Sequence, residues 1–342
     1  MIISLLKYKE GKSVVQNIDT LYYDGLNDQC PPVKVITPMK LSSKIAILYP
    51  GASPLGEQHP KMEMLGILLA QNGYKVYIPR IPPLKTLNIT SINVQWFIHF
   101  YKWILNIEEV DDNGLIMIGI SYGGGIMLKS CLQMKDELPV PKTLLTSGTY
   151  SDAESTVRFL LNGEIMVKGK KYQISPHEWG LVVIFHNFLK NIDLGWDTIG
   201  VEEVLKLHID EKFQERDELV RKLPKIQKGI ANSVLSGNAI PEVSEICKTI
   251  MENEKDILKS LSPKQWGHNI SQKVFIFHGA NDSMVPFTES IQLADYIPNS
   301  ELLISYIYEH KEISTDKGFF YKSREFIRML QFFSKFYYYH EN

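Results

Sequence analysis

One segment of the chain limits its possible folds more than any other: residues 115–130, LIMIGISYGGGIMLKS. Its first residues form an unbroken apolar run, which is typical of a strand buried on both faces. A Gly-Ile-Ser-Tyr-Gly sequence follows at residues 119–123, and a helical pattern begins there. Glycines two positions before and two positions after a serine permit a sharp, strained turn. The segment therefore predicts a strand, a tight turn and a helix, with the Ser121 hydroxyl lifted clear of the sheet.

A Gly-x-Ser-x-Gly sequence between a strand and a helix is typical of a nucleophile elbow. It makes Ser121 a candidate catalytic nucleophile and Gly119 and Gly123 the elbow glycines. The alternative is a glycine-rich strand-to-helix turn that carries an ordinary surface serine.

A nucleophilic serine needs a general base, and the base needs an orienting acid. Residues 273–279, KVFIFHG, read as a strand, and Asp282 lies in the loop that follows it. Residues 301–308 read as the next strand, and His310 comes directly after it. Because the carboxyl ends of parallel strands share one edge of a sheet, these residues can converge with Ser121.

In these features the chain resembles the α/β-hydrolase superfamily. The elbow GISYGGG, the acid loop HGANDSMVP and the strand that leads to His310 carry the resemblance, over residues 41–148 and 271–342. It implies Ser121 as nucleophile, Asp282 as acid and His310 as base. Some superfamily members place the acid after the strand that follows the elbow. In this chain Asp152 and Glu154 come after that strand, so they are the alternative acids.

The resemblance also implies an oxyanion hole made of two backbone N–H groups. One belongs to the residue after the nucleophile, here Tyr122, and the other to the loop after an early strand. Residues 44–53, KIAILYPGAS, fit that strand and loop. Gly51 matches the glycine of the family, so Ala52 is the expected second donor. An ordinary turn at the end of a strand is the alternative.

Strand and helix patterns alternate up to residue 150, which predicts an α/β fold with a mostly parallel, doubly wound sheet. We expect residues 1–150 and 270–342 to form this hydrolase core. The expected strands are residues 2–9, 19–23, 33–37, 45–49, 75–78, 115–118 and 142–146, the first three antiparallel at the edge; helices are expected at 60–72 and 91–107.

Residues 151–269 contain no convincing strand pattern and are predicted to form an inserted helical cap. Helical periods cover residues 153–161, 178–189, 201–207 and 243–261, and the basic cluster at 168–171 reads as a solvated loop. An apolar stripe along the second of these helices is expected to be cap core. The alternative is that Phe185, together with Trp179, lines a substrate pocket.

Composition narrows the possible functions. A formal net charge of −2 and a pI near 6.5 do not favour nucleic acid or an anionic membrane as a partner. No apolar run approaches the length of a membrane span, and a cytoplasmic location is the default expectation. Three distant cysteines form no CxxC pair, and neither a metal-ligand spacing nor a nucleotide motif occurs, so no metal or cofactor is expected. The sequence does not indicate an oligomeric state.

Together these patterns favour a carboxylesterase-like serine hydrolase, which cleaves an ester or related acyl bond in a small, hydrophobic substrate. Acyltransferase, thioesterase and peptidase activities use the same triad and stay open. A serine rather than an aspartate nucleophile argues against dehalogenase or epoxide-hydrolase chemistry. The alternative of a different class is a binding protein that has a hydrolase fold and no catalytic activity.

Overall fold

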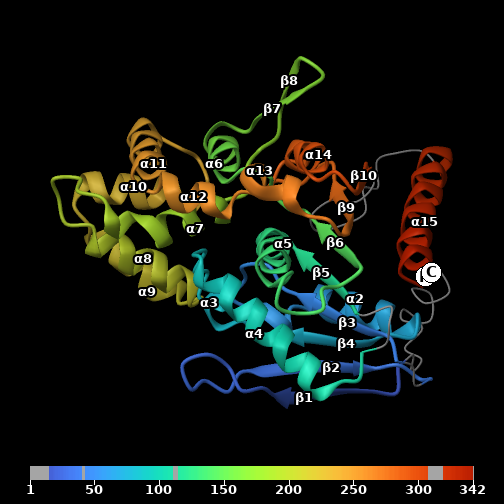
Figure 1. Ribbon diagram of the computed structural model, residues 1–342. Helices are drawn as coiled ribbons and strands as arrows, with labels where there is room; N and C mark the ends of the chain where they lie inside the picture. Colours follow the sequence, from blue (N-terminus) through green and yellow to red (C-terminus); the bar gives the residue numbers. More distant parts are fainter. Residues whose placement is uncertain (1–14, 41–42, 111–114, 307–318, 342) are drawn as a thin grey trace.

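The computed structural model describes residues 15–40, 43–110, 115–306 and 319–341. Within these residues eight strands form one sheet, in the order β1-β2-β4-β3-β5-β6-β9-β10 (Figure 1). The strands are β1 (Asn17–Tyr22), β2 (Pro32–Thr37), β3 (Ile45–Tyr49), β4 (Lys75–Pro79), β5 (Ile116–Ile120), β6 (Thr143–Ser147), β9 (Lys273–Gly279) and β10 (Ser300–Ser305). All of the expected strands that fall on described residues are present, and the one expected at residues 2–9 lies outside them.

The sheet is mostly parallel. Strand β2 pairs antiparallel with both β1 and β4, whereas all neighbours from β4 to β10 pair parallel. The antiparallel pairing at the edge and the parallel centre confirm the predicted fold class.

Helices cover both faces of the sheet because side chains alternate between the two faces along each strand. On β3, for example, Ile45 and Ile47 face one cluster of buried side chains and Ala46 and Leu48 face the other. The first cluster includes residues of α4, α5 and α14, and the second includes residues of α2 and α15. The bounds of these helices are α2 (Pro60–Gln71), α4 (Ile92–Ile107), α5 (Tyr122–Met134), α14 (Phe287–Tyr296) and α15 (Phe319–Glu341); α3 (Pro82–Lys85) and η1 (Gly56–Gln58) are short.

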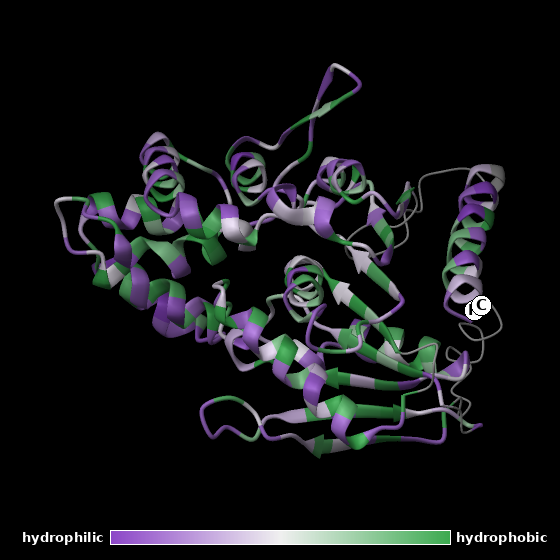
Figure 2. Cartoon of the chain, viewed as in Figure 1, coloured by the Kyte–Doolittle hydropathy of each residue, from purple (hydrophilic) through white to green (hydrophobic). Residues whose placement is uncertain are grey.

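Residues 151–269 are mainly helical, and their helices carry both hydrophobic and hydrophilic residues (Figure 2). Most members of a third buried apolar cluster come from this segment, joined by Leu87, Ala280, Phe287 and Ile304. The helices are α6 (Ala153–Asn162), α7 (Trp179–Phe188), η2 (Leu189–Asn191), α8 (Ile199–Ile209), α9 (Phe213–Lys222), α10 (Lys225–Ser236), α11 (Pro241–Asn253), α12 (Lys255–Leu261), α13 (Pro263–Trp266) and η3 (Gly267–Asn269). The expected helix over 243–261 is in fact two helices, because the backbone leaves helical geometry at Glu254 (φ −98°, ψ 17°). Helices α9 and α10 were not expected.

The expectation of no strand in this segment is wrong. A two-stranded antiparallel hairpin, β7 (Glu164–Val167) and β8 (Lys170–Gln173), projects from the molecule (Figure 1). Lys168 and Gly169 form its turn with φ values of 49° and 76°. Positive φ at both central residues is what a two-residue hairpin turn of type I′ requires. The basic cluster at residues 168–171 is therefore part of a hairpin rather than of an irregular loop.

The two ends of residues 151–269 are hydrogen-bonded to each other. The N–H of Ala153 donates to Ser262 Oγ (2.9 Å), and the N–H of Lys264 donates to the carbonyl of Ser151 (2.9 Å). The middle of the segment also reaches the sheet edge at which the parallel strands end. There the N–H of His177 donates to the carbonyl of Ser283, at 2.8 Å. The described helices include none that is both long and apolar enough for a membrane span.

Candidate active site

Ser121 occupies a strained turn between β5 and α5. Its backbone angles are φ 52° and ψ −127°, a region that non-glycine residues rarely adopt. Its N–H donates to the carbonyl of Ser147 at the end of β6 (2.7 Å), and its own carbonyl accepts from the N–H of Gly124 (3.0 Å). Conformations of this kind cost about 1–3 kcal/mol and persist only where the surrounding structure enforces them.

Both predicted elbow glycines are needed for close packing. A Cβ atom at position 119 would lie 2.6 Å from the Cα of Gly124. At position 123 it would lie 2.2 Å from the carbonyl oxygen of Pro50. Any larger side chain at either position would push the elbow away from its neighbours.

The loop after β3 lies beside the elbow. A Cβ atom on Gly51 would be 3.2 Å from the Cβ of Ser121, so the two backbones are in close contact. Over the described part of the chain, the N–H groups of Ala52 and Tyr122 make no hydrogen bond to another protein group. The next residue, Ser53, is held by a hydrogen bond from its N–H to the carbonyl of Leu84 (3.1 Å). The two N–H groups that the sequence analysis selected are thus available to a ligand.

Asp282 is buried in the loop after β9, with 3 % of its surface exposed. Its Oδ1 accepts hydrogen bonds from the N–H groups of Met284 (2.8 Å) and Val285 (3.0 Å). A Cβ atom at position 148 would lie 3.2 Å from its Oδ2. Gly148 follows β6, the neighbour of β5, so the Asp282 carboxylate lies one strand away from the elbow.

The predicted base, His310, lies outside the described residues, and so does the end of the expected strand at 301–308. Strand β10 ends at Ser305 and runs parallel to β9, toward the edge of the sheet that carries Asp282.

The two alternative acids are engaged at the start of α6. Asp152 caps this helix by accepting from the N–H of Glu154 (3.1 Å), and it also pairs with Lys264 (3.1 Å). Glu154 pairs with Arg158 one turn further along the helix (2.7 Å). Both carboxylates are thus engaged in contacts at the start of α6.

Comparisons with known proteins bear on the fold. No family model matches the chain, and no curated protein matches it. Among solved structures, the chain is similar to an acylaminoacyl peptidase in complex with Z-Gly-Gly-Phe-chloromethyl ketone, with a TM-score of 0.54 and 12% identity, over 96% of this chain and 43% of that one. It is also similar to the uncomplexed acylaminoacyl peptidase of Pyrococcus horikoshii, with a TM-score of 0.51 and 13% identity, over 95% of this chain and 42% of that one.

The chain has the α/β-hydrolase fold. It spans about two fifths of the length of these peptidase chains, as the covered shares of 42% and 43% indicate. Identities this low are informative about the fold alone.

Within the α/β-hydrolase fold, Phe185 and Trp179 have different surroundings. Phe185 is fully buried in the apolar cluster of residues 151–269, and this position favours the core role that the sequence analysis expected. Trp179 is half-buried, and its ring packs at 4.6 Å from that of His208. Trp179 is also two residues from His177, which is hydrogen-bonded to the loop that carries Asp282.

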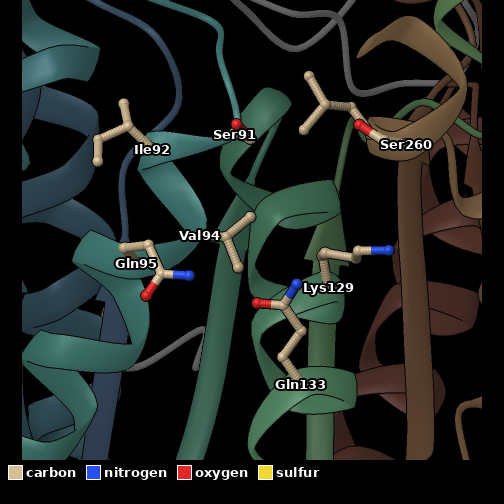
Figure 3. A pocket seen from close by; sticks show the side chains of 8 residues that line it. Ser91, Ile92, Val94, Gln95, Lys129, Gln133 and Ser260 are labelled. Carbon is tan, nitrogen blue, oxygen red and sulfur yellow. The ribbon is translucent and has the colours of Figure 1, made fainter. Parts of the chain in front are cut away.

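A pocket of about 390 Å³ lies between α4, α5 and α12, away from the elbow (Figure 3). Its lining residues are Ser91, Ile92, Val94, Gln95, Lys129, Gln133, Ser260 and Leu261, of which Figure 3 labels seven. Lys129 has its Nζ 4.9 Å from the centre of the Trp266 ring, and burial lowers the pKa of this lysine. None of the lining residues belongs to the elbow, to the loop after β3 or to the acid loop.

Thr149 and Ser290 also contact the candidate site, although neither was predicted from the sequence. Thr149 donates a hydrogen bond to the Ser121 carbonyl, and Ser290 is hydrogen-bonded to His278, which precedes the acid loop. No spacing or motif marks these residues, because each contact joins segments that are distant in sequence.

Proposed function

We propose that the chain is a serine hydrolase that cleaves an ester or related acyl bond, with Ser121 as nucleophile, Asp282 as acid and His310 as base. One observation above all supports this proposal. A strained serine between β5 and α5 lies one strand away from a buried carboxylate and beside a loop with an available N–H group. Strain of this kind clusters at functional sites.

In the proposed mechanism His310 takes the proton of the Ser121 hydroxyl, whose oxygen attacks the substrate carbonyl carbon. The N–H groups of Tyr122 and Ala52 stabilise the oxyanion of the tetrahedral intermediate. One such donor contributes about 3–4 kcal/mol of transition-state stabilisation. His310 then protonates the leaving group, and water, activated by the same histidine, releases the acid product from the acyl-enzyme. Asp282 orients the imidazole throughout, and the reaction needs neither a metal nor a cofactor.

We assign residues 151–269 to a cap over this site, while residues 1–150 and 270–342 form the hydrolase core. The hydrogen bond from His177 to Ser283 supports this assignment, because it brings the segment to the acid loop. A second contact joins α7 to the loop after α3. The Asn187 side chain accepts from the N–H of Ile89 (3.0 Å) and donates to the carbonyl of Leu87 (2.8 Å). A cap that excludes water would order a hydrophobic acyl substrate before attack.

Peptidase, thioesterase and acyltransferase activities would use the same groups. These activities differ in the leaving group of the substrate and in the nucleophile that attacks the acyl-enzyme. Neither group is part of the protein. Carboxylesterase activity is the form of the proposal to be tested first. A panel of nitrophenyl esters from acetate to palmitate measures both the activity and the preferred acyl length.

Labelling with a fluorophosphonate probe tests the proposal directly, because the probe reacts with an activated serine. We expect the wild-type protein to be labelled at Ser121 and the Ser121→Ala variant to stay unlabelled. Ser91→Ala, at an exposed serine, is the matched control and should label like wild type. A folded wild-type protein that neither labels nor hydrolyses any ester of the panel would indicate the alternative, a binding protein without catalytic activity.

A further inference from the structure

A chain of buried hydrogen bonds runs from the acid loop through His278 and Ser290. His278, the residue before the last residue of β9, is fully buried. Its Nε2 lies 2.9 Å from the carbonyl oxygen of Val285, and its Nδ1 lies 2.6 Å from Ser290 Oγ. A carbonyl oxygen can only accept a hydrogen bond, so Nε2 carries a proton and donates it to Val285.

His278 holds the turn that contains the acid. The carbonyl that accepts from His278 belongs to Val285, and the N–H on the other side of the Cα of Val285 donates to Asp282 Oδ1 (3.0 Å). The other carboxylate oxygen, Oδ2, lies 3.5 Å from His278 Nε2. A movement of the imidazole would therefore move Val285, whose N–H binds one carboxylate oxygen, and the ring that faces the other oxygen.

The other side of the imidazole is connected to the elbow. Ser290, near the start of α14, approaches the carbonyl oxygen of Thr149 with its Oγ at 3.3 Å. Thr149 in turn donates from its hydroxyl to the carbonyl of Ser121, at 3.1 Å. Ser290 and Thr149 are both fully buried. Ser290 has a single hydroxyl proton, which can be donated to His278 Nδ1 or to the Thr149 carbonyl but not to both at once, so this side chain lies between the imidazole and the backbone of Thr149.

We propose that His278, held by Ser290, is a positioning residue that sets the Asp282 carboxylate relative to Ser121. The proposal rests on the proposed serine hydrolase function. His278 contacts neither the nucleophile nor the expected position of the substrate, so it acts through Asp282. Its loss should lower kcat and leave KM nearly unchanged, because misplacement of a catalytic group affects the transition state more than substrate binding.

Two substitutions separate the two contacts of the imidazole. In His278→Gln the amide nitrogen can take the place of Nε2 and still donate to the Val285 carbonyl. The shorter side chain of His278→Asn reaches only the place of Nδ1, so it keeps the contact with Ser290 and loses the one with Val285. We expect His278→Asn to lower kcat on a nitrophenyl ester by about 10- to 100-fold, since a displacement of about 1 Å has an effect of this size. His278→Gln should recover part of this loss.

Ser290 provides a second, smaller change. We expect Ser290→Ala to lower kcat and Ser290→Thr to restore it, because threonine keeps the hydroxyl. The matched control is Ser233→Ala, at another buried serine whose hydroxyl donates to the backbone of Asn238 within residues 151–269. This control should lose stability without a change in kcat. Losses of kcat in the His278 and Ser290 variants that only follow the folded fraction would overturn the proposal.

Crystal structures of wild type, His278→Asn and Ser290→Ala test the positioning role even if the protein hydrolyses no ester. The proposal expects the Asp282 carboxylate to shift or become mobile in at least His278→Asn. An Asp282 carboxylate that keeps its place in both variants would refute it. If His278→Asn does not fold, the structure of Ser290→Ala is the test, and an Asp282 carboxylate that keeps its place in that variant refutes the proposal. Absent labelling of wild type refutes the proposed function instead, so the two failures are distinguishable.

Discussion

The hydroxyl of Thr149 donates a hydrogen bond of 3.1 Å to the carbonyl oxygen of Ser121. Thr149 follows β6 and is fully buried, while Ser121 is the strained residue between β5 and α5. The same carbonyl also accepts from the N–H of Gly124 (3.0 Å). Two donors thus hold the peptide after the candidate nucleophile, and one of them is a side chain that can be replaced.

Replacement of Thr149 should therefore weaken the elbow. We expect Thr149→Val, which keeps the shape and removes the donor, to lower the free energy of unfolding by about 1 kcal/mol. If the lost hydrogen bond is needed for the position of Ser121, kcat should fall about tenfold, the equivalent of about 1.4 kcal/mol in the barrier. Thr149→Ser keeps the hydroxyl and should restore both quantities, which urea unfolding and ester hydrolysis measure. Equal kcat in the two variants would contradict this role.

Two glycine substitutions should have opposite effects. A Cβ atom at Gly124 would lie 2.0 Å from Thr149 Oγ1, whereas at Gly229, inside α10, it would meet nothing within 4 Å. We expect Gly124→Ala to destabilise the protein by about 1–3 kcal/mol and to lower kcat, because Thr149 must move. Gly229→Ala should stabilise it by about 0.5–1 kcal/mol, since alanine is a better helix former than glycine. Equilibrium unfolding of the two variants gives the comparison, and a stable, fully active Gly124→Ala would contradict it.

The proposed triad predicts non-additive kinetics. Ser121→Ala, Asp282→Asn and His310→Ala should each lower kcat by several powers of ten, about 10⁴-fold for an acid that no longer orients its base. The double variants should lose little more than the single ones, because the three residues act as a unit. Steady-state hydrolysis of the best ester measures these ratios. A His310→Ala variant with a rate near that of wild type would show that another residue is the base.

Acidic pH should destabilise the region around His208. Burial, and then the neighbouring Arg216, lower the pKa of His208 below its usual 6.5, although Glu178 and Asp217 oppose the shift. Arg216 donates to its Nδ1 at 2.8 Å, which holds the neutral ring. Between the lowered pKa and 6.5 the unfolded chain binds more protons than the folded one, so stability falls as the pH falls below 6.5.

His208→Gln should therefore flatten the loss of stability with acid. Urea unfolding between pH 7.5 and pH 5, in steps of about 0.5, gives the free energy of unfolding of both proteins. We expect the curves to converge toward the acidic end. Parallel curves would mean that His208 makes no contribution to the pH dependence. Burial also lowers the pKa of His186, so part of the slope should remain in the variant.

Trp179 is the residue whose substitution should alter acyl preference. It is half-buried near the loop that carries Asp282, whereas Phe185 is fully buried among the apolar side chains of residues 151–269. We expect Trp179→Ala to change the ratio of kcat/KM between octanoate and acetate esters by about tenfold or more, the effect of a few methylene contacts. Phe185→Ala should instead lower stability by about 3–5 kcal/mol. An unchanged ratio in folded Trp179→Ala would remove this residue from the pocket.

Local sequence patterns were sufficient for most of the central sheet and for the elbow. The apolar runs at residues 45–49 and 115–118 give rise to β3 and β5, because a strand buried on both faces needs apolar side chains on both. The turn at Ser121 was also predictable, since only glycine fits at positions 119 and 123. These features depend on near neighbours in the chain, whose effects are visible in the sequence.

Tertiary structure alone decided the contacts between distant segments. Asp152 and Asp282 both follow strands, and only their surroundings differ. Asp152 caps the start of a helix and pairs with Lys264, whereas Asp282 lies in a buried turn beside Gly148. Likewise no local pattern connects Thr149 with Ser121, because that contact depends on how far β6 extends beside β5. A sequence pattern reports which groups a segment can bury, whereas the partner of each group is set by the packing of the whole chain.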